Sequence, residues 1–272
     1  MQRSTPERPP LDVERLRTAL AAPPTSYDVE VVDAAPSTNV LVADRARAGA
    51  PEGLVVVAEH QTAGRGRLDR TWTTPARAAL TFSVLLRPPV EAVAWPWLPL
   101  LTGVAVVRAL RENGSLTAAL KWPNDVLLGT RKTAGLLVER VDTSDGPAAV
   151  VGIGLNVSLT RADLPVEVAT SIWEEGGDVD RTDLLAATLR ALRREYASWL
   201  AAGGDAGGCG LAASYAALCT TLGRGVRVDL PSGDVLTGTA VRIASGGGLV
   251  VATDGGEVTV GAGDVVHVRP AG

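Results

Sequence analysis

The sequence predicts an α+β protein, in which a mixed β-sheet with helices on one face is followed by a small β-barrel. Two observations lead to this prediction. Short apolar runs and helical patterns follow one another from Val29 to Ala201, as a sheet and its covering helices require. From Gly223 onward, short alternating strands separated by turns occupy only about 50 residues, which is typical of a small barrel.

Each element of the first part has a local reason. Pro23-Pro24 ends the first helix, because proline lacks the backbone N–H that continues a helix. Ser37 and Thr38 are typical helix caps and predict a helix directly after them. Asn113-Gly114 ends a long apolar helix. The predicted helices are Leu11–Ala22, Asn39–Ala48, Pro96–Asn113 and Thr182–Ala201, and the predicted strands are Val29–Val32, Leu54–Ala58, Leu80–Leu86, Leu120–Trp122, Val126–Leu128, Ala134–Val141 and Ala149–Leu155.

A change in composition marks the second part. A Gly-rich break at 203–210 precedes a short helix at 211–218, and the barrel pattern follows. The sequence therefore divides into a flexible Pro-rich segment at 1–25, a larger domain at 26–222 and a barrel domain at 223–272. The predicted barrel strands are Val226–Leu230, Val235–Ala244, Leu249–Thr253, Val258–Val260 and Val265–Val268.

Composition argues against several classes of protein. The net charge is −4, so no global positive field favours nucleic acid. The two cysteines, Cys209 and Cys219, fit neither a zinc spacing nor a disulfide framework, which predicts a cytoplasmic protein. We find no apolar run that would span a membrane and no apolar signal core at the N-terminus.

The most informative segment is Gly64–Trp72, which reads Gly-Arg-Gly-Arg-Leu-Asp-Arg-Thr-Trp and follows the apolar run Leu54–Ala58. Glycines let the backbone approach a ligand closely. Arginines present planar sets of donors that suit phosphate and carboxylate oxygens. A loop of this composition after a strand is therefore suited to wrapping an anion.

Two further segments sharpen this prediction, Lys121–Asp125 and Lys132–Gly135. The chain has 24 Arg but only two Lys, and both lysines stand at the start of these segments. Because Lys and Arg are not interchangeable at a precise site, a compact ammonium group is expected to have a function there. The alternative is that both are ordinary surface lysines.

An anion-binding loop, an isolated lysine and side-chain amides suit a ligand that is part phosphate and part carboxylate. They predict activation of a carboxylic acid by a nucleotide, since positive groups must neutralise both reactants and stabilise charge at the α-phosphorus. Arg65, Arg67, Arg70 and Lys132 are the candidates. No Ser-His or Cys-His pair is placed for covalent catalysis. Asp125 could hold Mg²⁺, orient a ligand donor, or form a plain turn.

Together these motifs resemble the biotin protein ligases. Two residues depart from the family pattern: Leu136 replaces an isoleucine, and Asp69 replaces the glycine of the arginine-rich segment. Asp tolerates left-handed conformations better than most residues, so the turn can survive, and closure of this loop over ligand is expected. The matching motifs occur in family order and spacing at Ser37–Asn39, Gly64–Trp72, Lys121–Asp125, Lys132–Leu137 and Gly152–Val157.

The resemblance implies a catalytic domain of the biotin–lipoate ligase fold, similar to class II aminoacyl-tRNA synthetases, followed by an SH3-like barrel. It implies that biotin attacks the α-phosphate of ATP with Mg²⁺, giving biotinyl-5′-AMP and pyrophosphate. A lysine of the biotin carboxyl carrier domain of a carboxylase then receives the biotinyl group.

The resemblance also implies a role for individual residues. Lys132 and Arg67 would be catalytic. The implied biotin-binding residues are Ser37, Thr38, Asn39, Gln61, Gly64, Arg65, Gly66, Arg67, Lys132, Gly135 and Leu137. The implied ATP- and adenylate-binding residues are Arg67, Arg70, Trp72, Asn124, Lys132 and Asn156.

Two other functions are open. A lipoate or octanoate protein ligase would also use a reactive-site lysine, but the motifs at 64–72 and 121–125 point to biotin. A non-enzymatic interaction module would need aromatics interleaved with the basic loop, and aromatics are only 4% of the chain. Some members of the family carry an N-terminal winged helix-turn-helix. The residues before Val29 are too few for one, so no DNA binding is expected; both monomer and homodimer are plausible.

Overall fold

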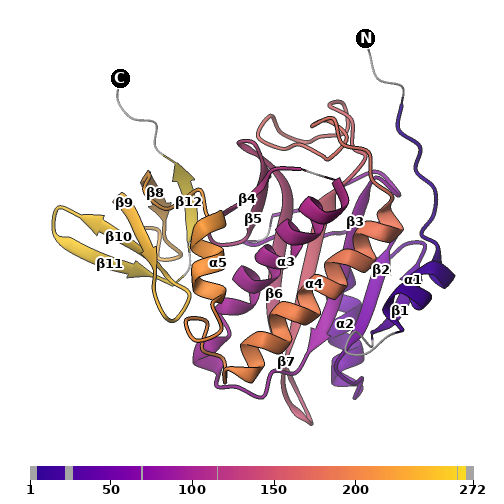
Figure 1. Cartoon of the computed structure of the whole chain (residues 1–272), viewed down its shortest axis with the longest axis horizontal. Helices are drawn as coiled ribbons and strands as arrows, with labels where there is room; N and C mark the ends of the chain where they lie inside the picture. The colour runs from indigo at the N-terminus through magenta and orange to yellow at the C-terminus, as the bar shows by residue number, and fades with distance from the viewer. Residues whose placement is uncertain (1–4, 22–26, 69, 115, 262, 268–272) are drawn as a thin grey trace.

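The structure is a computed structural model that describes residues 5–21, 27–68, 70–114, 116–261 and 263–267. Two sheets divide it (Figure 1). The larger sheet has seven strands, in the order β1 (Asp28–Val32), β2 (Leu54–Ala58), β3 (Ala79–Leu86), β7 (Gly146–Asn156), β6 (Arg131–Thr143), β5 (Asp125–Leu128) and β4 (Ala118–Lys121). The smaller, C-terminal sheet has five strands, in the order β11 (Gly256–Val260), β10 (Leu249–Thr253), β9 (Val235–Ile243), β8 (Gly225–Asp229) and β12 (Asp264–His267).

The pairing of the strands confirms a mixed sheet followed by an antiparallel one. β1 and β2 run parallel, whereas the other neighbours in the larger sheet pair antiparallel. All four ladders of the smaller sheet are antiparallel. The predicted strands and helices are present, with boundaries that differ by at most three residues. The division into domains near residue 222 stays a prediction, although the small sheet begins directly after it.

The helices cover both faces of the larger sheet, so the expectation of helices on one face is wrong. Along β2, Val55 and Val57 belong to one hydrophobic core, whereas Leu54 and Val56 belong to the core beneath the opposite helix. Because successive side chains of a strand alternate, a strand that is apolar throughout needs cover on both sides. Figure 1 shows on the near face α3 (Trp97–Gly114) and α4 (Arg181–Ala201), flanked by α1 (Val13–Leu20) and α5 (Leu211–Leu218), and on the far face α2 (Thr38–Arg47). A short 3₁₀ helix, η1 (Ala92–Ala94), precedes α3.

The start of α2 differs in detail from the predicted cap. Ser37 occupies the N-cap position, but its side chain makes no capping hydrogen bond. Instead the Gln61 side-chain oxygen accepts from the Thr38 backbone N–H at 2.8 Å. A side chain from after β2 therefore satisfies one of the free N–H groups of the helix. This contact fixes the first turn of α2 against the chain that follows β2.

Among the described residues, no helix has both the length and the hydropathy needed to cross a bilayer.

Candidate active site

A cavity of about 1200 Å³ is lined by residues of both sheets. The sequence-predicted residues that line it are Ser37, Thr38, Asn39, Gln61, Arg65, Gly66, Arg67, Arg70, Trp72, Asn124, Asp125, Lys132, Gly135, Leu137 and Asn156. Gly64 is not among the lining residues. It lies at the base of the hairpin described next, where a Cβ atom would lie 2.3 Å from the carbonyl oxygen of Trp72. Glycine is therefore needed at position 64 for the backbone to close.

One wall of the cavity is the arginine loop, residues 60–78, which joins β2 to β3. Its centre is a tight hairpin. Trp72 N donates to Gly64 O at 2.8 Å, and Gly66 N donates to Arg70 O at 2.6 Å. The hairpin presents its arginines to the cavity. Asp69 lies outside the described residues, so its effect on loop closure stays a prediction.

A buried network of hydroxyl and amide groups borders the cavity: Thr38 and Asn39 line it, and Ser83 bonds to both of them without lining it. The Ser83 hydroxyl donates to the Asn39 side-chain oxygen at 2.5 Å and lies 2.7 Å from the Thr38 hydroxyl. Asn39 Nδ2 donates to the Leu137 carbonyl at 3.3 Å and to Glu139 Oε2 at 2.6 Å. Thr38, Asn39 and Ser83 are each at most 3% exposed. Neutral polar groups held this firmly suit an uncharged polar ligand group such as a urea or an amide.

Glycines on β6 and β7 make room for three side chains of the site. A Cβ atom at Gly152 would lie 2.1 Å from the Asn39 side-chain oxygen. A Cβ atom at Gly154 would lie 2.6 Å from the Trp72 ring, and one at Gly135 would lie 3.1 Å from the Lys132 ammonium nitrogen. The glycines of these strands are therefore places where side chains approach the backbone closely.

Lys132 lines the cavity from the start of β6. Its ammonium group forms an ion pair with Asp125 at 2.6 Å and lies 5.9 Å from the centroid of the Trp72 ring. The side chains of Lys132 and Asp125 are partly buried, at 32% and 20% exposed. The Trp72 indole N–H is buried and has no hydrogen-bond partner among the described residues. One cation and one unused donor thus lie side by side in the lining.

The three arginines of the hairpin already have polar partners. Arg65 pairs with Glu139 at 3.3 Å, and Arg67 donates to the Asn124 side-chain oxygen at 3.1 Å. Arg70 pairs with Asp264 of β12. An anionic ligand in the cavity therefore has to compete with Glu139 and Asp264 for two of these guanidinium groups.

The pKa values of this region reflect burial and pairing. Burial lowers the pKa of Arg67 from its ordinary value, although Asp264 and Asp125 oppose that effect. The hydrogen bond to Asp264 raises the pKa of Arg70. Burial, the largest single influence, would raise the pKa of Asp264, but the hydrogen bond from Arg70 and the charges of Arg70, Lys121 and Arg67 together outweigh it and lower the pKa. Since arginine is protonated across the physiological range, Arg67 and Arg70 stay cationic despite these shifts.

The two predicted asparagines also hold the backbone of the site. Asn124 Nδ2 donates to the Leu136 carbonyl at 2.8 Å. The Asn156 amide donates to the Thr170 carbonyl at 2.9 Å and is 4% exposed. Asn124 thus joins the residue before β5 to β6, and Asn156 joins the end of β7 to the loop that follows it, in addition to lining the cavity.

Several lining residues have no counterpart in the sequence-based prediction. One group belongs to residues 157–173 after β7, here called the wall loop, which is attached to Lys132 through Lys132 N–Val168 O and Thr170 N–Lys132 O bonds of 2.8 Å each. The wall loop and the C-terminal lining segments lack a residue pattern with an obvious chemical role. Ser83, which bonds to Thr38 and Asn39 without lining the cavity, was missed because it lies inside an apolar strand. The further lining residues are Leu159, Pro165, Val166, Val168 and Ala169 of the wall loop, and Thr220, Arg224, Asp264, Val265, Val266 and His267 from the C-terminal part.

The candidate metal ligand that the sequence predicted is Asp125. The described residues contain no group of three or more His, Cys, Asp and Glu that could hold a metal. Asp125 lines the cavity beside Lys132. Mg²⁺ is commonly bound by one or two carboxylates together with substrate phosphates and water, so one carboxylate at this position fits a metal that arrives with a nucleotide.

Comparison with known proteins places these features in a class of enzymes. The sequence model of the biotin/lipoate A/B protein ligase family matches residues 31–156. The model of the biotin protein ligase C-terminal domain matches residues 221–268. The two matched regions correspond to the large sheet with the cavity and to the small sheet beside it.

Within the biotin/lipoate A/B protein ligase family, individual relatives indicate the biotin protein ligases. The chain is 39% identical to the biotin–[acetyl-CoA-carboxylase] ligase of Mycobacterium tuberculosis, over 96% of this chain and 97% of that protein. It is 36% identical to the bifunctional ligase/repressor BirA of Bacillus subtilis, over 63% of this chain and 54% of that protein. The solved biotin protein ligase from Aquifex aeolicus in complex with biotin and ATP is similar with a TM-score of 0.75 and 28% identity, covering 89% of this chain and 99% of that one. The chain therefore belongs to the biotin protein ligase family, as its motifs predicted.

Proposed function

We propose that this protein is an ATP-dependent biotin protein ligase that modifies a biotin carboxyl carrier domain. In the first step a biotin carboxylate oxygen attacks the α-phosphorus of ATP, the bond to the β-phosphate oxygen breaks, and pyrophosphate leaves. In the second step a lysine amine of the carrier attacks the acyl carbon, the bond to AMP breaks, and the nitrogen loses a proton. The supporting observation is one cavity in which Lys132 and three arginines lie next to the buried hydroxyl–amide network.

The biotin-binding roles follow from where the neutral groups lie. Thr38 and Asn39 line the cavity and supply hydroxyl and amide groups that can hydrogen-bond a ureido ring, and Ser83 orients both through its hydroxyl group. Gln61 holds the first turn of α2 and lines the same cavity. Gly135 and Leu137 border the path from this network to Lys132 on β6. The remaining residues proposed to contact biotin are Ser37, Gly64, Arg65, Gly66, Arg67 and Lys132.

The nucleotide-binding roles follow from the charges. Lys132 would stabilise the charge that develops as the carboxylate meets the α-phosphate. Arg67 and Arg70 would bind phosphate oxygens, and Trp72, Asn124 and Asn156 would line the adenylate. Asp125 is the residue proposed to hold Mg²⁺, and the metal would neutralise part of the triphosphate charge. Since the acyl-adenylate is not bound covalently, no nucleophilic side chain is needed.

The test is exchange of labelled pyrophosphate into ATP, measured with Mg²⁺ and with biotin, lipoate or octanoate. Biotin-dependent exchange is the expected result. Exchange with lipoate or octanoate alone would contradict it, and so would exchange that is independent of any acid. A biotin carboxyl carrier domain, added next, should acquire one biotin on its lysine, and a Lys→Arg carrier should not.

Three further points belong to this proposal. The protein is proposed to be cytoplasmic, where its carrier substrate is made. It is proposed not to bind DNA, because a net charge of −4 gives no global positive field that would attract a polyanion. Its oligomeric state is proposed to be monomer or homodimer. Filter binding to double-stranded DNA at several salt concentrations and light scattering with and without biotin and ATP test the last two points.

A further inference from the structure

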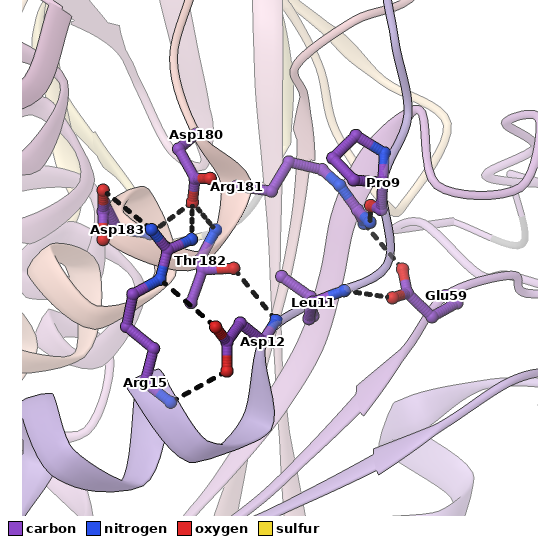
Figure 2. Close-up of polar contacts among 9 residues, drawn as sticks. All are labelled: Pro9, Leu11, Asp12, Arg15, Glu59, Asp180, Arg181, Thr182 and Asp183. Carbon is purple, nitrogen blue, oxygen red and sulfur yellow. Dashed lines mark hydrogen bonds and ion pairs between the residues drawn. The ribbon is translucent and has the colours of Figure 1, made fainter.

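A short N-terminal segment, residues 8–12, crosses the bases of both loops that wall the cavity; we name it the strap. Figure 2 shows two of its contacts, the Arg181 side chain donating to Pro9 O at 2.6 Å and Leu11 N donating to Glu59 Oε1 at 2.7 Å. In addition, Asp12 N donates to the Thr182 hydroxyl at 3.2 Å. The strap is thus fixed to the end of β2 and to the start of α4.

A buried ion pair lies beneath the strap. Glu59 and Arg181 are 2.7 Å apart, and their side chains are 5% and 7% exposed. Removing one partner of such a pair leaves an uncompensated buried charge, so the pair is strongly held as a unit. The strap gives the carboxylate a donor at Glu59 Oε1 and gives the guanidinium an acceptor, so it satisfies part of the hydrogen bonding of this pair, while Arg181 Nε has no hydrogen-bond partner among the described residues.

The ion pair sits where the arginine loop leaves and rejoins the sheet. Glu59 directly precedes the loop, and its carbonyl accepts from Arg77 N at 2.7 Å. Arg181 donates to the carbonyl of Ala79, the first residue of β3, at 3.3 Å. The pair and the strap therefore fix both ends of the loop that carries the cationic residues of the cavity.

The other end of the strap holds the wall loop. Arg8 donates to Ser158 O at 3.0 Å and pairs with Asp163 at 2.7 Å. Asp163 also accepts from the N–H and the hydroxyl of Thr160, at 2.9 Å each, so Arg8 is attached to a formed turn. Ser158 N in turn donates to Ala78 O at 2.8 Å, which joins the wall loop to the end of the arginine loop.

We infer that the strap is a positioning element for substrate binding, in which Arg8, Glu59 and Arg181 set the relative position of the arginine loop and the wall loop. None of the three lines the cavity, so they act through the loops and do not touch the ligand. Detaching the strap frees the bases of two loops at once, and both loops contribute lining residues that a ligand must find in place. The inference rests on the proposed function only where activity is the readout.

The chain offers a matched pair of variants. Arg8→Ala removes the contact between the strap and the wall loop. Arg15→Ala removes an arginine of the same N-terminal region, whose pairs with Asp180 and Asp183 join α1 to the start of α4 (Figure 2). Its third pair, with Asp12 at the end of the strap, lies within the first turn of α1. Both variants change the net charge equally, and both remove partly exposed ion pairs. Only the first one reaches a loop of the cavity.

Hydrogen exchange without substrate is the first measurement. Arg8→Ala should accelerate exchange of amides in 157–173 and, to a smaller extent, in 60–78, whereas Arg15→Ala should leave both loops as in the original chain. In pyrophosphate exchange, Arg8→Ala should raise KM for biotin and ATP by roughly threefold to tenfold and change kcat less. Arg8→Lys, which keeps the charge opposite Asp163, should restore part of both effects.

Unchanged loop exchange and unchanged KM in Arg8→Ala would overturn the inference. Equal effects of Arg8→Ala and Arg15→Ala would also overturn it, because they would show general loosening of the N-terminal region. If the original chain shows no biotin-dependent reaction, the proposed function fails, and the hydrogen-exchange comparison still decides the role of the strap.

Discussion

Two regions of the cavity hold their polar groups in different ways. The hydroxyl–amide network of Thr38, Asn39 and Ser83 is buried, and its members are bonded to one another within the sheet and α2. Two arginines of the hairpin, Arg65 and Arg70, are more exposed, at 49% and 59% of the side chain, and their partners are the carboxylates Glu139 and Asp264.

The difference indicates two modes of recognition. A buried neutral network needs little reorganisation when a ligand binds, because its groups are already oriented. It can therefore select a ligand by shape and hydrogen bonding. Arg65 and Arg70 exchange a protein carboxylate for a ligand anion. The free energy that they contribute to ligand binding is therefore the difference between two ion pairs. Substitutions in the network should therefore affect stability and biotin binding together, whereas substitutions at the exposed Arg70–Asp264 pair should affect mainly nucleotide binding.

The largest effect is expected at Lys132, where the two regions meet. Lys132→Ala should lower the rate of adenylate formation by about 100- to 1000-fold, the range found when one group that stabilises transition-state charge is lost. The melting temperature should change little, because the ion pair with Asp125 is partly exposed. Biotin-dependent pyrophosphate exchange measures the first effect and calorimetry the second. Normal exchange in this variant would remove Lys132 from the reaction.

The second largest effect is expected at Gly152, where a substitution tests the rigidity of the buried network. Gly152→Ala places a Cβ atom 2.1 Å from the Asn39 side-chain oxygen, so Asn39 or β7 must move. Overpacking of this kind costs about 1–3 kcal/mol, and KM for biotin should rise as the network shifts. Urea unfolding and biotin titration measure the two changes.

Gly246→Ala is the control for the glycine experiment. A Cβ atom there meets nothing within 4 Å, and the residue has no positive φ. Its free energy of unfolding should stay within about 0.5 kcal/mol of the original chain. Equal stability of the two variants would show that β7 yields easily, and the proposed contrast between the regions would be wrong.

The sequence predicted the cavity residues better than it predicted what holds them. Lys132, Arg67 and their neighbours belong to local motifs whose residue types indicate an anion site, and in the structure they line the same cavity. Ser83 was missed because it occupies one position in an apolar strand, where a single hydroxyl carries no periodic signal. The ion pair beneath the strap was missed for another reason. Glu59 and Arg181 lie 122 positions apart (181 − 59), and only the fold brings them within 2.7 Å.

The fold shows the same limit. Hydrophobic runs located the strands, but they did not say which face each helix covers. That information lies in the alternation along β2, where Leu54 and Val56 serve one core and Val55 and Val57 the other. The N-terminus of α2 was assigned to a local cap, whereas Gln61 supplies the contact from another segment.

A pH-dependent effect is expected on the C-terminal side of the cavity. Burial, with Lys121 and Arg224 nearby, lowers the pKa of His267 from 6.5 to about 4. The unfolded chain therefore binds a proton here below pH 6.5 that the folded chain takes up only near pH 4, so this group reduces stability as pH falls through that window. His267→Gln should lose less stability between pH 7 and pH 4 than the original chain in urea unfolding. Identical pH profiles would assign the acid sensitivity to other groups.

The smallest effect is expected at the exposed pair between Arg70 and Asp264. Asp264→Asn should change the free energy of unfolding by less than about 1 kcal/mol, because exposed ion pairs contribute little. It should lower KM for ATP by up to about fivefold at low salt, since the same small energy no longer has to be given up when Arg70 turns to a phosphate. The difference should vanish at high ionic strength, where such pairs are screened. A higher KM for ATP would have the opposite meaning: Asp264 would then hold Arg70 in its binding position, and the arginine side of the cavity would be organised in advance, as the buried network is.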